Sequence, residues 1–310
     1  MNEPLTVAFH PSGLQIIVGF ADKIRCMNIC ARNLKVYQEL FIKSCREIKF
    51  SNGGHLFACI DNHNIKVFRF YQGDCPEGYT FKEHVNKVRS INWFDDDSGF
   101  VSSGIDGVCL AWKLNPDSVE ILNANRRSQE EEKSVKNYTY KTEYRQGRFV
   151  DVAIKSESKN TYYALTEDRH IKEIENGKEK VRFETGYNYS SIVSFLGSKI
   201  IAAGVAEEDK PGAIQFFKNP WERLLEIQAH SSGVERIRLT FSNTQLLSAG
   251  SDGSLCVFDV KDKEPKLRKD GKELPTITQS EDILITKVER DKFREDVDLL
   301  RKEILIKKDA

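Results

Sequence analysis

A serine, a histidine and an aspartate in this chain match in type the three residues of a nucleophilic triad. They are Ser102, His84 and Asp106. In such a triad the histidine takes the proton of the serine hydroxyl and the aspartate orients the histidine. No Gly-x-Ser-x-Gly turn surrounds Ser102. The same three residue types also return with the same spacing near the end of the chain, which favours a repeated structural role. The second set is His230, Ser248 and Asp252.

The segment around the first set has the composition of three β-strands. Apolar runs at 90–94 and 99–103 are followed by the Asp106-Gly107 turn and a third run that ends at Trp112. An Asp-Gly pair between alternating apolar runs predicts a hairpin, because both central residues accept positive φ. We therefore expect three antiparallel strands whose His84, Ser102, Asp106 and Trp112 side chains share one hydrogen-bond chain.

This spacing resembles that of a WD-repeat blade, although Glu83 stands where Gly is usual and Lys113 where the final Asp would be. Five more units share the strand-turn-strand pattern. They span residues 5–28, 47–70, 149–174, 192–217 and 234–259. In the last one Phe258 replaces the tryptophan. The turns at 22, 62, 106, 168, 211 and 252 lie 40, 44, 62, 43 and 41 residues apart, and a propeller blade takes roughly 40–45. The sequence thus predicts an all-β WD-repeat β-propeller with six readable blades, and the alternative is that these six belong to a seven-bladed ring.

The propeller is expected to cover residues 1–286, with two irregular segments. The long interval contains a charged insertion at about 123–147, which we interpret as a loop. A basic connector at 261–275 follows the sixth unit, and we interpret it as a solvated loop. The run at 282–286 is a candidate for the outer strand of the sixth blade.

A helix is predicted at 287–310. Thr286 and Glu289 form a capping-box pattern that starts it. Four apolar residues spaced 4, 3 and 4 apart form a coiled-coil seam. They are Phe293, Val297, Leu300 and Ile304. We favour the start of an oligomerisation or docking rod, while an amphipathic helix that folds back on its own propeller is the alternative.

Composition excludes several classes of function. The 47 basic and 47 acidic residues cancel, so no global charge indicates nucleic acid or an anionic membrane. No apolar run is long enough for a membrane span, and no secretion signal opens the chain, so we expect a soluble intracellular protein. The seven cysteines show no paired metal spacing and are interpreted as reduced, mostly buried thiols. No metal, cofactor or small-molecule substrate is expected.

Propellers present loops from many blades on one face, so the expected activity is recognition of partner proteins. The loops that enter the inner strands should carry that face, together with the 205–211 insertion. Aromatic and arginine residues are enriched at binding hot spots. The candidate face residues are Lys87, Tyr144, Arg145, Tyr187 and Tyr189.

Several stretches resemble one family. They are PLTVAFHPSGLQIIVGFADKIRCMN, CREIKFSNGGHLFACIDNHNIKVF, VRSINWFDDDSGFVSSGIDGVCLAW, the last unit, and DILITK before the helix. They are similar to the C-terminal propeller and the start of the coiled coil in the cilia- and flagella-associated WD-repeat coiled-coil proteins of the axoneme. The similarity is weakest at 115–190.

The resemblance implies a non-enzymatic axonemal scaffold or adaptor that helps to assemble or dock inner dynein arms and neighbouring regulatory and radial-spoke complexes, in the cytoskeleton of the cilium or flagellum. Self-association through the helix is a further expectation. Members of the family have an additional N-terminal propeller and a longer coiled coil, so this chain is expected to be a fragment or a shortened paralogue. The alternative is a general intracellular WD-repeat adaptor, such as a substrate receptor or an RNA-processing subunit. A propeller enzyme would require carboxylates or metal ligands that converge on the central channel, and no such repeated set is evident.

Overall fold

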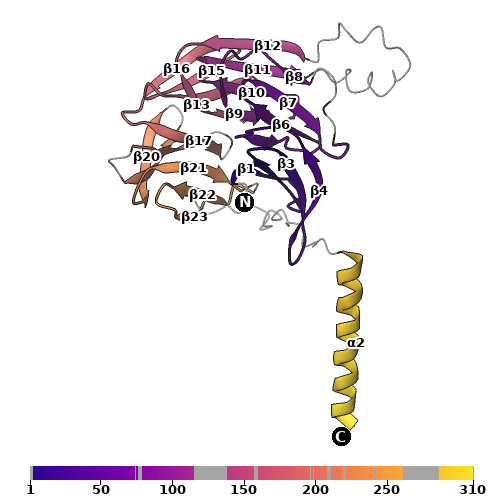
Figure 1. The fold of residues 1–310 in the computed structure, drawn as a ribbon. Coiled ribbons are helices and arrows are strands. Elements are labelled where there is room, and N and C mark those ends of the chain that lie inside the picture. Colours follow the sequence, from indigo (N-terminus) through magenta and orange to yellow (C-terminus); the bar gives the residue numbers. More distant parts are fainter. Residues whose placement is uncertain are drawn as a thin grey trace, which may run out of the picture.

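Six antiparallel sheets surround a common centre and form a β-propeller, from which helix α2 (Lys287–Asp309) extends away (Figure 1). This computed structural model describes residues 3–73, 75, 79–114, 138–156, 160–195, 197, 199–207, 211–218, 221–240, 242–260 and 286–309. We number the sheets as blades 1 to 6 in chain order. The predicted all-β propeller followed by a helix is confirmed.

Each blade is a meander in which successive strands pair as neighbours. Blades 1 and 2 contain β1 (Pro4–Phe9), β2 (Gln15–Phe20), β3 (Ile24–Ile29), β4 (Leu34–Leu40), β5 (Ile48–Phe50), β6 (Leu56–Asp61), β7 (Asn64–Arg69) and β8 (Thr80–Phe81). Blades 3 and 4 contain β9 (Val88–Trp93), β10 (Gly99–Gly104), β11 (Val108–Leu114), β12 (Tyr138–Arg145), β13 (Phe149–Ile154), β14 (Thr161–Thr166), β15 (His170–Glu175) and β16 (Lys178–Glu184). Blades 5 and 6 contain β17 (Tyr189–Phe195), β18 (Ile200–Val205), β19 (Gly212–Lys218), β20 (Glu222–His230), β21 (Val234–Leu239), β22 (Gln245–Gly250) and β23 (Leu255–Asp259).

The turns between the second and third strands lie where the repeat predicted them. Among the described turn residues, four have a positive φ, each in a different blade: Asn62 at 59°, Gly107 at 78°, Arg169 at 60° and Gly253 at 76°. Glycine and asparagine accept this left-handed conformation most readily. Local turn chemistry therefore fixed the strand boundaries.

The prediction of a loop at 123–147 is wrong for residues 138–145. Tyr138–Arg145, which belongs to the segment at 123–147, forms strand β12 and pairs with β11 as the outer strand of blade 3. Its alternating tyrosines and threonines suit a strand, and the high charge of the preceding residues obscured that pattern. Residues 115–137, the connector at 261–275 and residues 282–285 of the candidate outer strand lie outside the described residues.

The core of the propeller lies between the blades. Five clusters of buried apolar side chains each join one blade to the next, from the pair 1–2 to the pair 5–6. The cluster between blades 2 and 3 contains the fully buried Trp112 and Phe100. Each sheet has two faces, and in this stacking each neighbouring blade covers one of them. Four of the seven cysteines are buried within these layers: Cys26, Cys45, Cys59 and Cys109.

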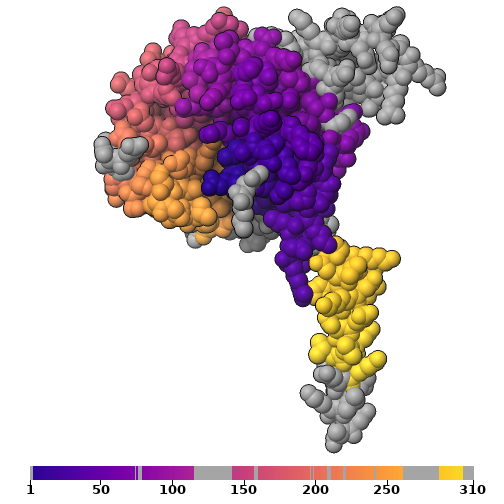
Figure 2. All heavy atoms as spheres, in the orientation of Figure 1, coloured from indigo at the N-terminus to yellow at the C-terminus, as the bar shows by residue number. Residues whose placement is uncertain are grey.

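Helix α2 begins with the predicted capping box. Glu289 accepts from the Thr286 hydroxyl at 2.7 Å and from the Thr286 amide at 3.0 Å, and the Glu289 amide donates back to the Thr286 hydroxyl. The helix does not fold back along the propeller (Figure 1). It meets the turn between β3 and β4, where the guanidinium of Arg32 lies 4.9 Å from the centre of the Phe293 ring (Figure 2). Val297 and Leu300 are exposed.

Candidate functional site

In blade 3 the four predicted side chains form one hydrogen-bond chain. The indole N–H of Trp112 lies 3.0 Å from the Ser102 hydroxyl oxygen, which lies 2.8 Å from Nε2 of His84. Nδ1 of His84 lies 2.9 Å from the Asp106 carboxylate. The carboxylate accepts, so Nδ1 carries the proton and Nε2 accepts from Ser102. The chain therefore ties the loop before β9 to β10, β11 and the turn between them.

This order of contacts is also that of a catalytic triad, but Ser102 is inaccessible. It is fully buried, and His84 is 3% exposed. The Trp112 indole occupies one side of the serine oxygen. A substrate carbonyl would have to displace that indole from the apolar layer between blades 2 and 3, so the geometry supports a structural role.

Blade 6 has a variant of the same arrangement. His230 contacts the Ser248 hydroxyl at 2.8 Å through Nε2, and the Ser254 hydroxyl at 2.7 Å through Nδ1. Asp252 lies 3.3 Å from Nδ1 of His230. Hydrogen bonds, first from the Ser254 hydroxyl and then from backbone amides, hold the pKa of Asp252 well below its usual range. Phe258 pairs with Leu246 and has no donor to offer Ser248.

The candidate face residues separate into two groups. Lys87 and Arg145 are exposed and Tyr187 is half-buried. They lie before β9, at the end of β12 and before β17, which places them on one face of the ring by strand direction. The prediction is wrong for Tyr144 and Tyr189, which are 6% and 3% exposed. Both lie within strands, where their rings pack between blades and their hydroxyls contact Glu179 and Gln215.

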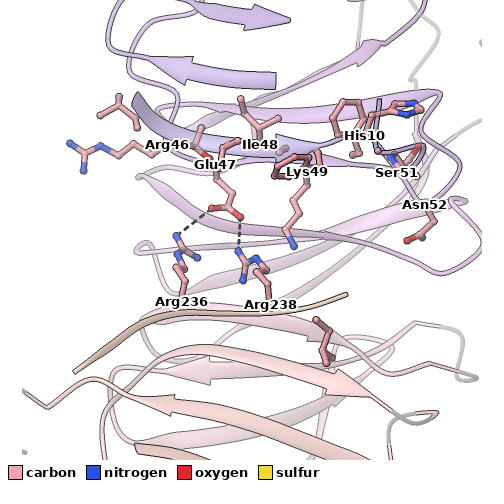
Figure 3. Close-up of a pocket in the computed structure, with 18 residues that line it drawn as sticks. His10, Arg46, Glu47, Ile48, Lys49, Ser51, Asn52, Arg236 and Arg238 are labelled. Carbon is pink, nitrogen blue, oxygen red and sulfur yellow. Dashed lines mark hydrogen bonds and ion pairs between the residues drawn. The ribbon is translucent and has the colours of Figure 1, made fainter. Parts of the chain in front are cut away.

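A cluster of charged residues, which sequence reasoning missed, lies at the central channel. Glu47 accepts from Arg236 at 3.3 Å and from Arg238 at 3.4 Å, which links blade 2 to blade 6 (Figure 3). Lys49 lies beside them and donates to Asn92 of blade 3 at 3.0 Å. These side chains border a pocket of about 670 Å³ whose walls are β1, β5 and β21.

Asp151 is a second inward-facing carboxylate, and it is 2% exposed. It accepts from the Ser90 hydroxyl at 2.6 Å, the Val152 amide at 2.9 Å, the Ser191 hydroxyl at 2.9 Å and the Ile192 amide at 3.1 Å. Four donors saturate its oxygens. Asp151 thus fastens the inner strands of blades 3, 4 and 5 to one another.

The sequence held a signal for this cluster. The inner strands of blades 2 to 6 each interrupt their apolar pattern with a polar residue: Lys49, Asn92, Asp151, Ser191 and Arg238. Aligning the inner strands of the six units would have placed these residues together.

In the described part of the chain, no group of three or more His, Cys, Asp or Glu side chains is arranged to hold a metal ion. The same residues include no helix that is both long and apolar enough to cross a membrane.

Lys49 gives the channel a measurable pH dependence. Burial, then repulsion from Arg238 and Arg236, lowers its pKa to about 8, although Glu47 and Asp151 act in the opposite direction. The unfolded chain has a lysine pKa of about 10.4. Between these values the unfolded state binds more protons, so rising pH stabilises the fold. We expect the midpoint of thermal unfolding of the wild type, relative to Lys49→Met, to rise between pH 8 and 10.

The control variant is Lys180→Met. The hydrogen bond that Lys180 donates to Glu175 raises the pKa of Lys180, so the same difference should not rise with pH for that variant. A flat pH profile for Lys49→Met would contradict the assigned environment of Lys49.

Comparison with known proteins agrees with the fold. The family model "WD domain, G-beta repeat" matches residues 76–113 and 221–259, which carry the His84 and His230 networks. Cilia- and flagella-associated protein 57 A of Tetrahymena thermophila is 31% identical over 98% of this chain. Protein 57 C of the same organism is 32% identical over 94%, and cilia- and flagella-associated protein 57 of Mus musculus is 31% identical over 93%. The chain is a WD-repeat propeller related to the cilia- and flagella-associated proteins.

The similarity extends beyond the two matched repeats to almost the entire chain, so the resemblance given by the sequence stretches is confirmed. This WD-repeat chain spans 25%, 23% and 21% of the lengths of these three relatives. It therefore corresponds to one part of each of them.

Proposed function

We propose that this chain is a non-enzymatic scaffold of the axoneme that binds components of the inner dynein arm, the neighbouring regulatory complex or the radial spokes. The similarity to cilia- and flagella-associated proteins over 93–98% of the chain carries this proposal. The propeller supplies a rigid body held together by five apolar layers between blades. Proteins of this architecture work by presenting surfaces to partners.

The helix is the second binding element of this proposal. Phe293, Val297 and Leu300 are 37%, 46% and 57% exposed, and together with Ile304 they follow a coiled-coil spacing. An exposed apolar stripe on a helix is covered by a partner helix or by a second copy. We assign the helix seam to docking, and Lys87, Arg145 and Tyr187 to a contact surface on the propeller.

A tagged chain expressed in a ciliated cell tests this function. We expect the wild type to decorate axonemes and Val297→Asp/Leu300→Asp to lose that localisation, because two carboxylates in the seam would be desolvated by a partner helix. The control is Lys292→Asn/Arg294→Asn, which changes the net charge by the same amount at exposed positions outside the seam. A diffuse or nuclear wild-type chain would instead favour the general intracellular adaptor.

A further inference from the structure

The junction between blade 1 and blade 6, which we call the blade 1/6 junction, differs from the other five. In the described residues each of the other junctions contains an apolar cluster from both blades. The sixth cluster comes from blade 1 alone and consists of Ile16, Val18 and Met27 with Phe20 and Ile29 around it. At the channel end of this junction, Arg236 and Arg238 of blade 6 form ion pairs with Glu47 of blade 2.

Blade 1 presents apolar side chains at this junction. Val7 pairs with Val18 and Phe9 with Ile16, so Val7 and Phe9 share the face of the blade 1 cluster. They are 54% and 62% exposed. Both lie on the innermost strand, which contains no exposed residue in blades 2 to 5.

Blade 6 presents a mixed face. Arg238 pairs with Leu247, which pairs with Val257, so the three share one side of the sheet. Leu247 and Val257 are exposed. Arg236 and Arg238 are two residues apart on β21 and therefore point to the same side. This side is cationic at the channel and apolar further out.

Positively charged side chains outnumber negatively charged ones in the pocket where the junction meets the central channel. The pocket is bordered by Arg46, Lys49, Arg236 and Arg238, and by one carboxylate, Glu47 (Figure 3). Arg236 and Arg238 retain solvent-exposed side-chain surface of 44% and 39%, so an incoming anion can reach them.

We propose that the blade 1/6 junction binds an extended segment of a partner protein in which acidic and apolar side chains alternate. Successive side chains of a strand point to opposite sides. The acidic residues would face Arg236 and Arg238 on blade 6, and the apolar residues would face Val7 and Phe9 on blade 1. Both pairs have a spacing of two residues, which matches the period of a strand. The positive charge of the two arginines favours acidic residues in the peptide, and the exposed side chains of Val7 and Phe9 favour apolar residues between them.

This proposal deepens the scaffold function and rests on it, because a partner protein supplies the segment. The two are tested separately. Peptide binding is measured on the purified chain, and a failure there leaves the localisation experiment intact. A chain that binds the peptide but stays diffuse in ciliated cells would remove only the axonemal assignment.

The test uses a fluorescent ten-residue peptide of alternating glutamate and valine with the full chain. We expect it to bind at least tenfold more tightly than an alternating lysine-valine peptide and an alternating glutamate-serine peptide. Raising the salt concentration should weaken binding, since the contacts include charge pairs. Equal binding of all three peptides, or no binding of the glutamate-valine peptide by a folded chain, overturns the proposal.

Variants locate the site. Arg236→Gln/Arg238→Gln should weaken binding at least tenfold, and Phe9→Ser should weaken it several-fold without loss of fold, because Phe9 is largely exposed. Glu47→Gln should strengthen binding, because it removes the carboxylate that competes for both arginines. Arg182→Gln, at an exposed position of β16, is the control and should leave affinity unchanged. If the double arginine variant does not fold, Phe9→Ser and Glu47→Gln decide, and unchanged affinity in both contradicts the site.

Discussion

Replacing Trp112 with alanine should lower the free energy of unfolding by about 3–5 kcal/mol. Trp112 is fully buried between blades 2 and 3, within a cluster that includes Phe81 and Phe100. Its removal leaves a cavity in that layer and also deprives the Ser102 hydroxyl of the indole donor at 3.0 Å. Chemical denaturation followed by circular dichroism measures the loss.

Trp112→Phe separates the two contributions. It preserves most of the apolar contact but loses the indole N–H, as blade 6 does with Phe258. We expect it to cost about 1–2 kcal/mol, well below the alanine variant. Similar losses for both variants would show that the hydrogen bond, and not the packing, dominates at this position.

The second large effect is expected at Asp151. Asp151→Ala should destabilise the propeller by about 2–4 kcal/mol, because it leaves the buried Ser90 and Ser191 hydroxyls and the Ile192 amide without their acceptor. These donors belong to different blades. The variant should therefore also increase hydrogen exchange at the inner strands of blades 3 and 5, where the packing of neighbouring strands is otherwise unchanged.

Two comparisons calibrate this result. Asp151→Asn retains one carbonyl acceptor and should lose about half as much stability. Asp259→Ala removes an exposed carboxylate at the end of β23 and should stay within about 0.5 kcal/mol of the wild type. If Asp151→Ala matches Asp259→Ala, the channel network does not hold the inner strands together.

Sequence reasoning succeeded where the cause is local. The Asp-Gly pairs predicted turns with positive φ at both residues, and Gly107 and Gly253 adopt it whereas Asp106 and Asp252 do not. The capping box at Thr286 and Glu289 is likewise an interaction between residues three apart. Because these turns recur at a regular spacing and each blade must cover its neighbour, the local signals were sufficient to predict six blades.

It failed where burial depends on the neighbouring blade. Tyr144 and Tyr189 have the residue type of a binding surface, but their rings fill the layers between blades. Tyr138–Arg145 resembled the charged insertion before it and proved to be an outer strand. In each case the strand's partner, and not its own composition, decides which side chains meet solvent.

The channel cluster illustrates the limit most clearly. Glu47 and Arg238 are separated by 191 positions in the sequence, yet their side chains are 3.4 Å apart. Their charges cancel in the overall composition, which therefore gives no sign of a local excess. Only the closure of the ring brings them together.

The position of helix α2 has a mechanical consequence. The chain reaches the helix from blade 6, and the helix touches the β3–β4 turn of blade 1 through Arg32 and Phe293. A tensile force applied along the helix is therefore shared by the two blades that flank the blade 1/6 junction. Force that pulls blades 1 and 6 apart meets no apolar layer from both blades among the described residues, and the nearby ion pairs of blade 6 go to Glu47 of blade 2. The ring would therefore yield first at this point. Tension on helix α2 is thus coupled to separation of blades 1 and 6.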